Sequence, residues 1–225
     1  MFQRIFAAGL LAGFLAGLVL SAMHWVRIDP LIAAAETYED AAAQHGATAH
    51  AQAWEPEGFE RSALTFLANL VIAIGFGLLL SGAFALREAV SGKSPDAREG
   101  LLWGIGGFAA FALAPAAGLP PVPPGMLGAD IFARQAWWLG TAIATAGGLA
   151  LLVFPRRAAW RVLGAALILA PHLVAAPAPP PGTDAVPAAL ATQFVAASLV
   201  AAALFWLTLG GVGGWLYARF ERSPP

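Results

Sequence analysis

Six long apolar stretches dominate the sequence and restrict what it can fold into. About 20 helical residues cross the hydrocarbon core of a bilayer, which is roughly 30 Å thick. Charged residues are scarce, at 11% of the chain against 59% hydrophobic residues, whereas a soluble protein has about 25% charged residues. We therefore expect an all-α integral membrane protein, folded as a single polytopic domain over residues 1–225. Its predicted transmembrane helices, about six in number, span residues 5–25, 62–86, 101–118, 135–154, 160–176 and 188–217.

The basic residues between these helices predict their orientation. With the N-terminus in the cytoplasm, nine Lys and Arg residues lie inside, and only Arg27, Arg61 and Arg134 lie outside. Positive charge accumulates on the cytoplasmic side of membrane proteins, so both termini are predicted inside, with a long outer loop at residues 26–61. The apolar run after Arg4 is longer than a signal-peptide core, so we expect it to remain as the first transmembrane helix.

The other two outer connections are rich in proline and similar to each other. Each begins at a proline near the end of an outward-going helix, Pro115 or Pro171, and precedes a helix with an early glutamine, Gln135 or Gln193. The pattern indicates three outward hairpins, the last two being either distant copies or chance matches of low-complexity sequence. Polyproline segments are stiff without internal hydrogen bonds, so these connections would hold the shape of the outer mouth.

Glycine recurs at four-residue spacing in three of the predicted helices. Such spacing allows helix backbones to approach closely. We expect this chain to pack against itself there, and a homo-oligomer interface is the alternative. The glycines concerned are Gly9, Gly13 and Gly17, then Gly100 and Gly104, then Gly210 and Gly214.

Several classes of function are excluded by what the sequence lacks. A formal net charge of −1 is incompatible with a broad nucleic-acid surface. The absence of cysteine removes disulfides, thiolate metal sites and thiol nucleophiles. No P-loop, GxSxG, HExxH or CxxC motif is present. We predict a protein that is not an enzyme and has no cofactor. An intramembrane enzyme is the weaker alternative, since no carboxylate lies within a predicted helix core.

Strongly polar side chains at membrane depth fall almost entirely in the outer half of the predicted helices. A polar group facing lipid is costly, so we expect these groups to face the bundle interior or a water-filled vestibule. Arg134 begins a helix, where a cation is unfavourable, and Asp130 or Glu60 is its expected partner. Glu60 would also complement the helix dipole at its own position. The predicted vestibule comprises Glu60, Asn69, Arg134, Gln135 and Gln193, together with two histidines.

These histidines, His24 and His172, are candidate ligands for a divalent transition-metal cation. Imidazole binds such metals. His24 ends the first predicted helix, and His172 follows Pro171, which frees a backbone carbonyl. The alternative is that both rings bond to backbone groups or lipid headgroups.

Three carboxylates in the long outer loop form a second candidate site. Glu36, Glu39 and Asp40 stand at i, i+3 and i+4, so a helix would place all three on one face. With His45 and His50 nearby they would collect cations at the outer mouth. The alternative is an ordinary solvated face.

Short motifs along nearly the whole chain resemble one family. Among them are Pro30-Leu31-Ile32 with Ala35-Glu36, Glu60-Arg61, Trp103-Gly104, Gly118-Leu119-Pro120-Pro121, Arg134-Gln135 with Trp137-Trp138, and Pro171-His172. In this order they resemble the predicted cobalt transporter family of CbtA type, which comprises bacterial inner-membrane proteins. The stretch 41–53 departs from the family pattern, which puts His45 and His50 in doubt as ligands.

The resemblance implies a function and a partner. It implies uptake of Co²⁺ linked to cobalamin biosynthesis, and a small one-helix companion protein with a histidine-rich end. We therefore expect a multi-pass protein of the bacterial cytoplasmic membrane that transports a divalent cation. A non-conducting accessory or assembly protein is the alternative.

Overall fold

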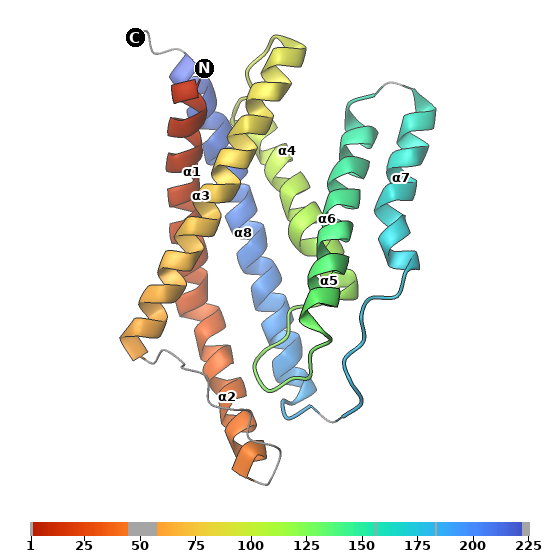
Figure 1. The fold of residues 1–225 in the computed structure, drawn as a ribbon. Helices are drawn as coiled ribbons and strands as arrows, with labels where there is room; N and C mark the ends of the chain where they lie inside the picture. The colour runs from red at the N-terminus through yellow and green to blue at the C-terminus, as the bar shows by residue number, and fades with distance from the viewer. Residues whose placement is uncertain (1, 45–57, 156, 183, 222–225) are drawn as a thin grey trace. The chain divides into compact units, whose positions relative to one another are not determined.

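The computed structural model describes residues 2–44, 58–155, 157–182 and 184–221. All regular secondary structure within these residues is helical, which confirms the expected all-α class (Figure 1). The described residues form six continuous helices, two of which contain a π-helical turn. Their elements are α1 (Phe2–Met23), η1 (His24–Ile28) and α2 (Asp29–Gln44); α3 (Gly58–Ser91); α4 (Ala97–Phe108), η2 (Ala109–Leu113) and α5 (Ala114–Gly118); α6 (Ile131–Val153); α7 (Ala158–Leu173); and α8 (Ala188–Glu221).

Five of the described helices are long and apolar enough to cross a membrane. The sixth, α7, is apolar but has 16 residues, or about 24 Å at 1.5 Å per residue. The chain is therefore a multi-pass helical membrane protein, and the side that each helix end faces stays a prediction. The five long helices span Phe2–Ala42, Gly58–Ser91, Ala97–Gly118, Ile131–Val153 and Ala188–Glu221.

Two prolines are accommodated in continuous helices by the π-helical turns. Pro30 follows η1 and Pro115 follows η2, each as the second residue after the turn. A proline ring inside an α-helix clashes with the carbonyl four residues back, and a π-helical turn widens the helix just before it. In η2 the Ala114 N–H bonds to the Ala109 carbonyl, five residues back. Helix therefore continues through Pro30 to Gln44, within the segment expected to be the outer loop.

The contacts divide the chain into two compact units, which are described separately. In its described residues, unit 1 comprises 2–27, 58–105 and 200–221, and unit 2 comprises 28–44, 106–155, 157–182 and 184–199. The prediction of a single domain over residues 1–225 stays a prediction.

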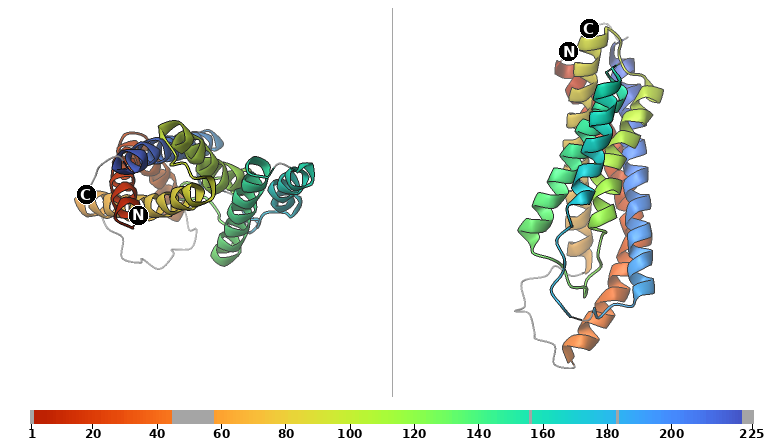
Figure 2. Two further views of the ribbon diagram at one scale, coloured as in Figure 1. Left: turned by 90° about the horizontal axis from the view of Figure 1, so that it is seen from above. Right: turned by 90° about the vertical axis from the view of Figure 1, so that its right-hand side faces the viewer.

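Unit 1 is held together by two seams of glycine. Along the first seam α1 packs on α3, and a Cβ on Gly13 would lie 2.6 Å from the Cα of Ile74. Along the second seam the backbones of α4 and α8 touch at Gly100 and Gly210, and both views of Figure 2 show these helices side by side. The glycine spacing therefore packs this chain against itself, as expected from the sequence.

Unit 2 contains the pair of α6 and α7 and the two proline-rich connections. Gly148 and Gly164 bring α6 and α7 together, since a Cβ on either would lie 2.6 Å from the other's carbonyl oxygen. The two connections bond to each other, because the Leu127 N–H donates to Asp184 (3.0 Å) and the Ala185 N–H to the Gly125 carbonyl (3.2 Å). Gly125, at φ +77°, also lies against Glu39 of α2. Unit 2 thus joins both proline-rich segments to the acidic helix.

Candidate functional site

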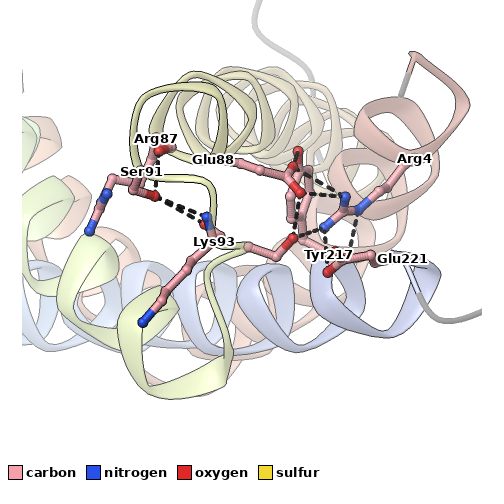
Figure 3. A network of polar contacts seen from close by, with 8 residues as sticks. Arg4, Arg87, Glu88, Ser91, Lys93, Tyr217 and Glu221 are labelled. Carbon is pink, nitrogen blue, oxygen red and sulfur yellow. Dashed lines mark hydrogen bonds and ion pairs between the residues drawn. The ribbon is translucent and has the colours of Figure 1, made fainter.

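A network of charged and hydroxyl groups closes one end of unit 1 (Figure 3). The Arg4 Nη1 atom of α1 lies 3.1 Å from both carboxylate oxygens of Glu88 on α3. Arg4 also donates to Ser94 (2.6 Å) and to the Tyr217 carbonyl on α8 (2.7 Å). Ser94 and the Tyr217 hydroxyl donate to Glu88 at 2.6 and 2.8 Å, and Arg4 lies 3.5 Å from Glu221. These five residues are called the terminal network below.

Apart from Glu221, the terminal network is well shielded from solvent. The Arg4 side chain is 13% exposed and the Glu88 side chain 24%, and Tyr217 is fully buried. The Arg4 guanidinium also lies over the Tyr217 ring, 3.8 Å from its centroid, where it gains a cation–π interaction. The start of α1, the end of α3 and the end of α8 therefore meet at one end of unit 1.

Sequence reasoning missed this network. The second helix predicted from the sequence covers residues 62–86, which would leave Glu88 in a loop, but α3 continues to Ser91. It ends there because Gly92 adopts φ +69° and its N–H bonds back to the Glu88 carbonyl (2.8 Å), a conformation that glycine favours. The sequence did place the opposite charges of Arg4 and Glu88 on the same predicted side of the membrane, and this could have indicated their ion pair.

A second polar cluster lies between α1 and α3, at the other end of α1 from Arg4. Asn69 is 7% exposed, and its amide nitrogen lies 3.3 Å from Ser21 Oγ and 3.2 Å from His24 Nδ1. His24 opens η1, and its Nδ1 also lies 3.1 Å from the Leu20 carbonyl. The structure thus brings together two of the predicted polar residues, His24 and Asn69. His24 also begins a π-helical turn, and such turns are frequent at functional sites.

The position of the His24 proton decides what this cluster can bind. If Nδ1 carries the proton, it donates to the Leu20 carbonyl, and Nε2 keeps the lone pair that binds a metal. If Nδ1 accepts a hydrogen bond from the Asn69 amide, Nε2 carries the proton and cannot be a ligand. The two hydrogen bonds exclude each other, so Asn69 bears directly on the ability of His24 to bind a cation.

The acidic residues Glu36, Glu39 and Asp40 lie on helix α2, so their spacing places them on one helix face. Glu39 and Asp40 are exposed, whereas Glu36 is half-buried and engaged in an interaction. Glu39 borders the proline-rich connection at Gly125. His45 and His50 lie outside the described residues.

His172 lies in the last turn of α7, on the surface of unit 2. Its ring meets Trp137 of α6 edge-on, with centroids 6.1 Å apart, and the Trp137 indole donates to the Val174 carbonyl (3.4 Å). No hydrogen bond to the His172 ring occurs among the described residues. Both ring nitrogens are therefore free of protein partners in the described part of the chain.

The remaining vestibule candidates are dispersed. Gln135 and Gln193 are exposed on α6 and α8, and Glu60 is exposed in the first turn of α3. The expected ion pair of Arg134 with Asp130 is wrong. Asp130 instead caps α6 by accepting from the Ala133 N–H (2.9 Å), and the ion pairs of the described residues do not include Arg134.

Candidate metal ligands do not form a ready-made site in the part of the chain that the structure describes. Among those residues, no three or more His, Cys, Asp or Glu side chains lie close enough together to hold a metal ion. His24 belongs to unit 1, whereas His172 and the three carboxylates of α2 belong to unit 2. A transported ion is cargo, so each candidate ligand would be a point of passage and not a resident metal site.

The fold and these polar clusters define a class of protein, a polytopic α-helical membrane protein with polar groups between its helices. The chain belongs to the CbtA family, whose model, described as "Probable cobalt transporter subunit (CbtA)", matches residues 2–218. This confirms the resemblance seen in the sequence motifs, and the description of the family is that of a probable transporter subunit. No curated protein and no solved structure matches the chain.

Proposed function

We propose that this protein is the membrane-spanning component of a transporter that carries Co²⁺ across the bacterial cytoplasmic membrane to supply cobalamin biosynthesis. The observation that carries the proposal is the family match over residues 2–218. The link to cobalamin and the choice of membrane follow from the resemblance of the sequence motifs to that family.

We propose that the cation passes its candidate ligands one after another. In unit 2 the exposed carboxylates of Glu39 and Asp40, with Glu36 beside them, would attract divalent cations at the outer mouth. His172, exposed and without a hydrogen bond in the described chain, would offer an imidazole to the incoming ion. In unit 1 His24 would accept the ion at membrane depth through Nε2, with Asn69 controlling its tautomer.

Arg134, Gln135 and Gln193 of unit 2, and Glu60 of unit 1, stay candidates for polar groups that would solvate the entering ion. The sequence contains no ATP-binding motif, and the membrane potential supplies about 2.3 kcal/mol per charge per 100 mV. The proposed partner is a small one-helix protein whose histidine-rich end would add metal affinity.

Vesicles test the transport function. The purified chain, reconstituted alone or with its small partner, should carry Co²⁺ inward when the potential is negative inside, measured by quenching of a trapped metal-sensitive dye. Protein-free vesicles are the control. No uptake by the chain in either form would favour the accessory or assembly role instead.

His172 variants test the proposed ligand. His172→Ala should lower Co²⁺ uptake about tenfold or more, because an imidazole ligand is lost, and the melting temperature should change little because the ring is exposed. Uptake by the parent should also fall in acid, since protons compete with metal for imidazole. His172→Gln keeps a hydrogen-bonding group but is a poor ligand. Normal uptake by His172→Gln, with failure of His172→Ala, would mean that His172 is only a structural hydrogen-bonder.

The acidic face of α2 can be tested by salt. Replacing Glu36, Glu39 and Asp40 together by glutamine should slow uptake at low metal by about threefold or more at low ionic strength. The effect should shrink at physiological salt, where the Debye length is about 8 Å. Glu99→Gln, on the predicted inner side, is the control. If the triple variant and the parent took up Co²⁺ at equal rates at every salt concentration, the three carboxylates would have no role in attracting the cation.

A further inference from the structure

Unit 1 consists of two helix pairs, each locked by backbone contact. In the first pair, α1 and α3 meet at Gly13 and Gly77, where an added Cβ would strike the facing backbone. In the second pair, α4 and α8 meet at Gly100 and Gly210 in the same way. Such closely packed interfaces leave little room for the two helices to shift against each other, so each pair should move as one body.

The contacts between the two pairs are of a different kind. Phe84 of α3 meets Trp103 of α4 and Tyr217 of α8 edge-on, with centroids 5.9 and 5.7 Å apart. Phe76 of α3 meets Trp206 of α8 edge-on at 5.0 Å. Aromatic edges keep favourable contact over a range of offsets, so these layers allow one pair to shift against the other.

The terminal network provides directional bonds between the pairs. Apart from the Arg4–Glu88 ion pair, which lies within the first pair, its contacts join the first pair either to α8 or to Ser94 in the connection between α3 and α4. Arg4 reaches the Tyr217 carbonyl, Ser94 and Glu221, and Glu88 accepts from the Tyr217 hydroxyl and from Ser94, which lies just before α4. Both carboxylate oxygens of Glu88 are therefore engaged, and each guanidinium nitrogen of Arg4 has a partner (Figure 3).

We infer that the terminal network is a latch between two rigid helix pairs, and that the pairs part at this end of unit 1 when the latch opens. In this structure the bonds of the latch are formed, and the rings of Phe84 and Tyr217 next to them are fully buried. The transport purpose rests on the proposed function: a parted end would let the cation leave on the side of the chain termini. The mechanical inference rests on the contacts alone.

Spin-label distances test the latch directly, because the chain has no native cysteine. One label at Val90→Cys on the first pair and one at Leu102→Cys on the second, both exposed, report on the gap between pairs. Labels at Phe6→Cys and Leu86→Cys, both within the first pair, report on its rigidity. The full-length protein is measured in lipid without metal, as the parent and with Glu88→Gln, Tyr217→Phe or Glu221→Gln.

The latch predicts a selective change. With an open state populated at about 1% in the parent, Glu88→Gln should raise the population of the longer Val90–Leu102 distance about tenfold, and Tyr217→Phe should raise it less. The Phe6–Leu86 distance should stay unchanged. Glu221→Gln, whose side chain is 51% exposed and makes one 3.5 Å contact, should raise the population of the longer Val90–Leu102 distance least of the three variants.

Two outcomes would overturn the inference. Unchanged Val90–Leu102 distances in both Glu88→Gln and Tyr217→Phe would show that the network does not hold the pairs, even if uptake were normal. Equal lengthening within the first pair would show general loosening instead of parting. A selective change without Co²⁺ uptake in any form of the protein would support the latch and reject the transport function.

Discussion

Gly77→Ala is expected to destabilise the protein strongly, whereas Gly75→Ala, two residues away on the same helix, is expected to have almost no effect. A Cβ at Gly77 would strike the Gly9 carbonyl oxygen and lie 3.1 Å from the Gly13 Cα, and neither backbone atom can rotate away. A Cβ at Gly75 meets nothing within 4 Å. Overpacking of a tight interface costs about 1–3 kcal/mol, and a substitution in open space costs less than about 0.5 kcal/mol.

The melting temperature in detergent and recovery as a single species after gel filtration would measure this difference. Unit 2 offers an independent repeat, because Gly148 touches the Gly164 carbonyl whereas the adjacent Gly147 faces open space. Gly148→Ala should therefore lower the melting temperature and Gly147→Ala should not. If both variants of a matched pair lowered the melting temperature equally, glycine would be needed for the flexibility of the helix and not for close packing at the seam.

A reporter fused after Pro225 is expected to be active only in the cytoplasm, and one inserted at Ala47 only on the outside. The reason is the distribution of charge, because basic residues are retained on the cytoplasmic side. The nine basic residues predicted inside are Arg4, Arg87, Lys93, Arg98, Arg156, Arg157, Arg161, Arg219 and Arg222. The terminal network agrees with a common side for both ends of the chain, since it brings the start of α1 and the end of α8 together.

Two reporters, one active only in the cytoplasm and one active only after export, distinguish the two sides of the membrane at each position. One reporter should fold only in the reducing cytoplasm and the other only after export, each placed at both positions. If the reporters placed the Ala47 and Pro225 positions on the same side of the membrane, the predicted number of membrane crossings would be wrong. Reversal of both positions would contradict the orientation while leaving the helix count intact.

Much of the fold could be predicted because it depends on local properties. Crossing hydrocarbon requires a run of apolar residues of sufficient length, which residues 5–25 and 135–154 display without reference to their neighbours. A spacing of three and four places Glu36, Glu39 and Asp40 on one helix face wherever that helix lies. Glycine at Gly100 and Gly104 similarly indicated that some backbone approaches closely.

The helix ends were harder to predict because they depend on weaker effects. Pro30 would normally interrupt a helix, but the π-helical turn at residues 24–28 accommodates it, and the helix continues to Gln44. Likewise α3 runs beyond residue 86 until Gly92 terminates it. Only a few hydrogen bonds separate these alternatives, so apolar length alone could not decide between them.

The amino-acid sequence by itself determined the membrane class, the family, the helical state and the faces that carry glycine and acid. The tertiary structure decided which faces meet: Gly100 with Gly210, His24 with Asn69, and Arg4 with Glu88 and Tyr217. The physical reason is that periodicity reports the direction of a side chain about its own helix axis. The identity of the partner depends on packing between residues far apart in the chain, where a buried charge requires a counter-charge and a glycine requires a facing backbone.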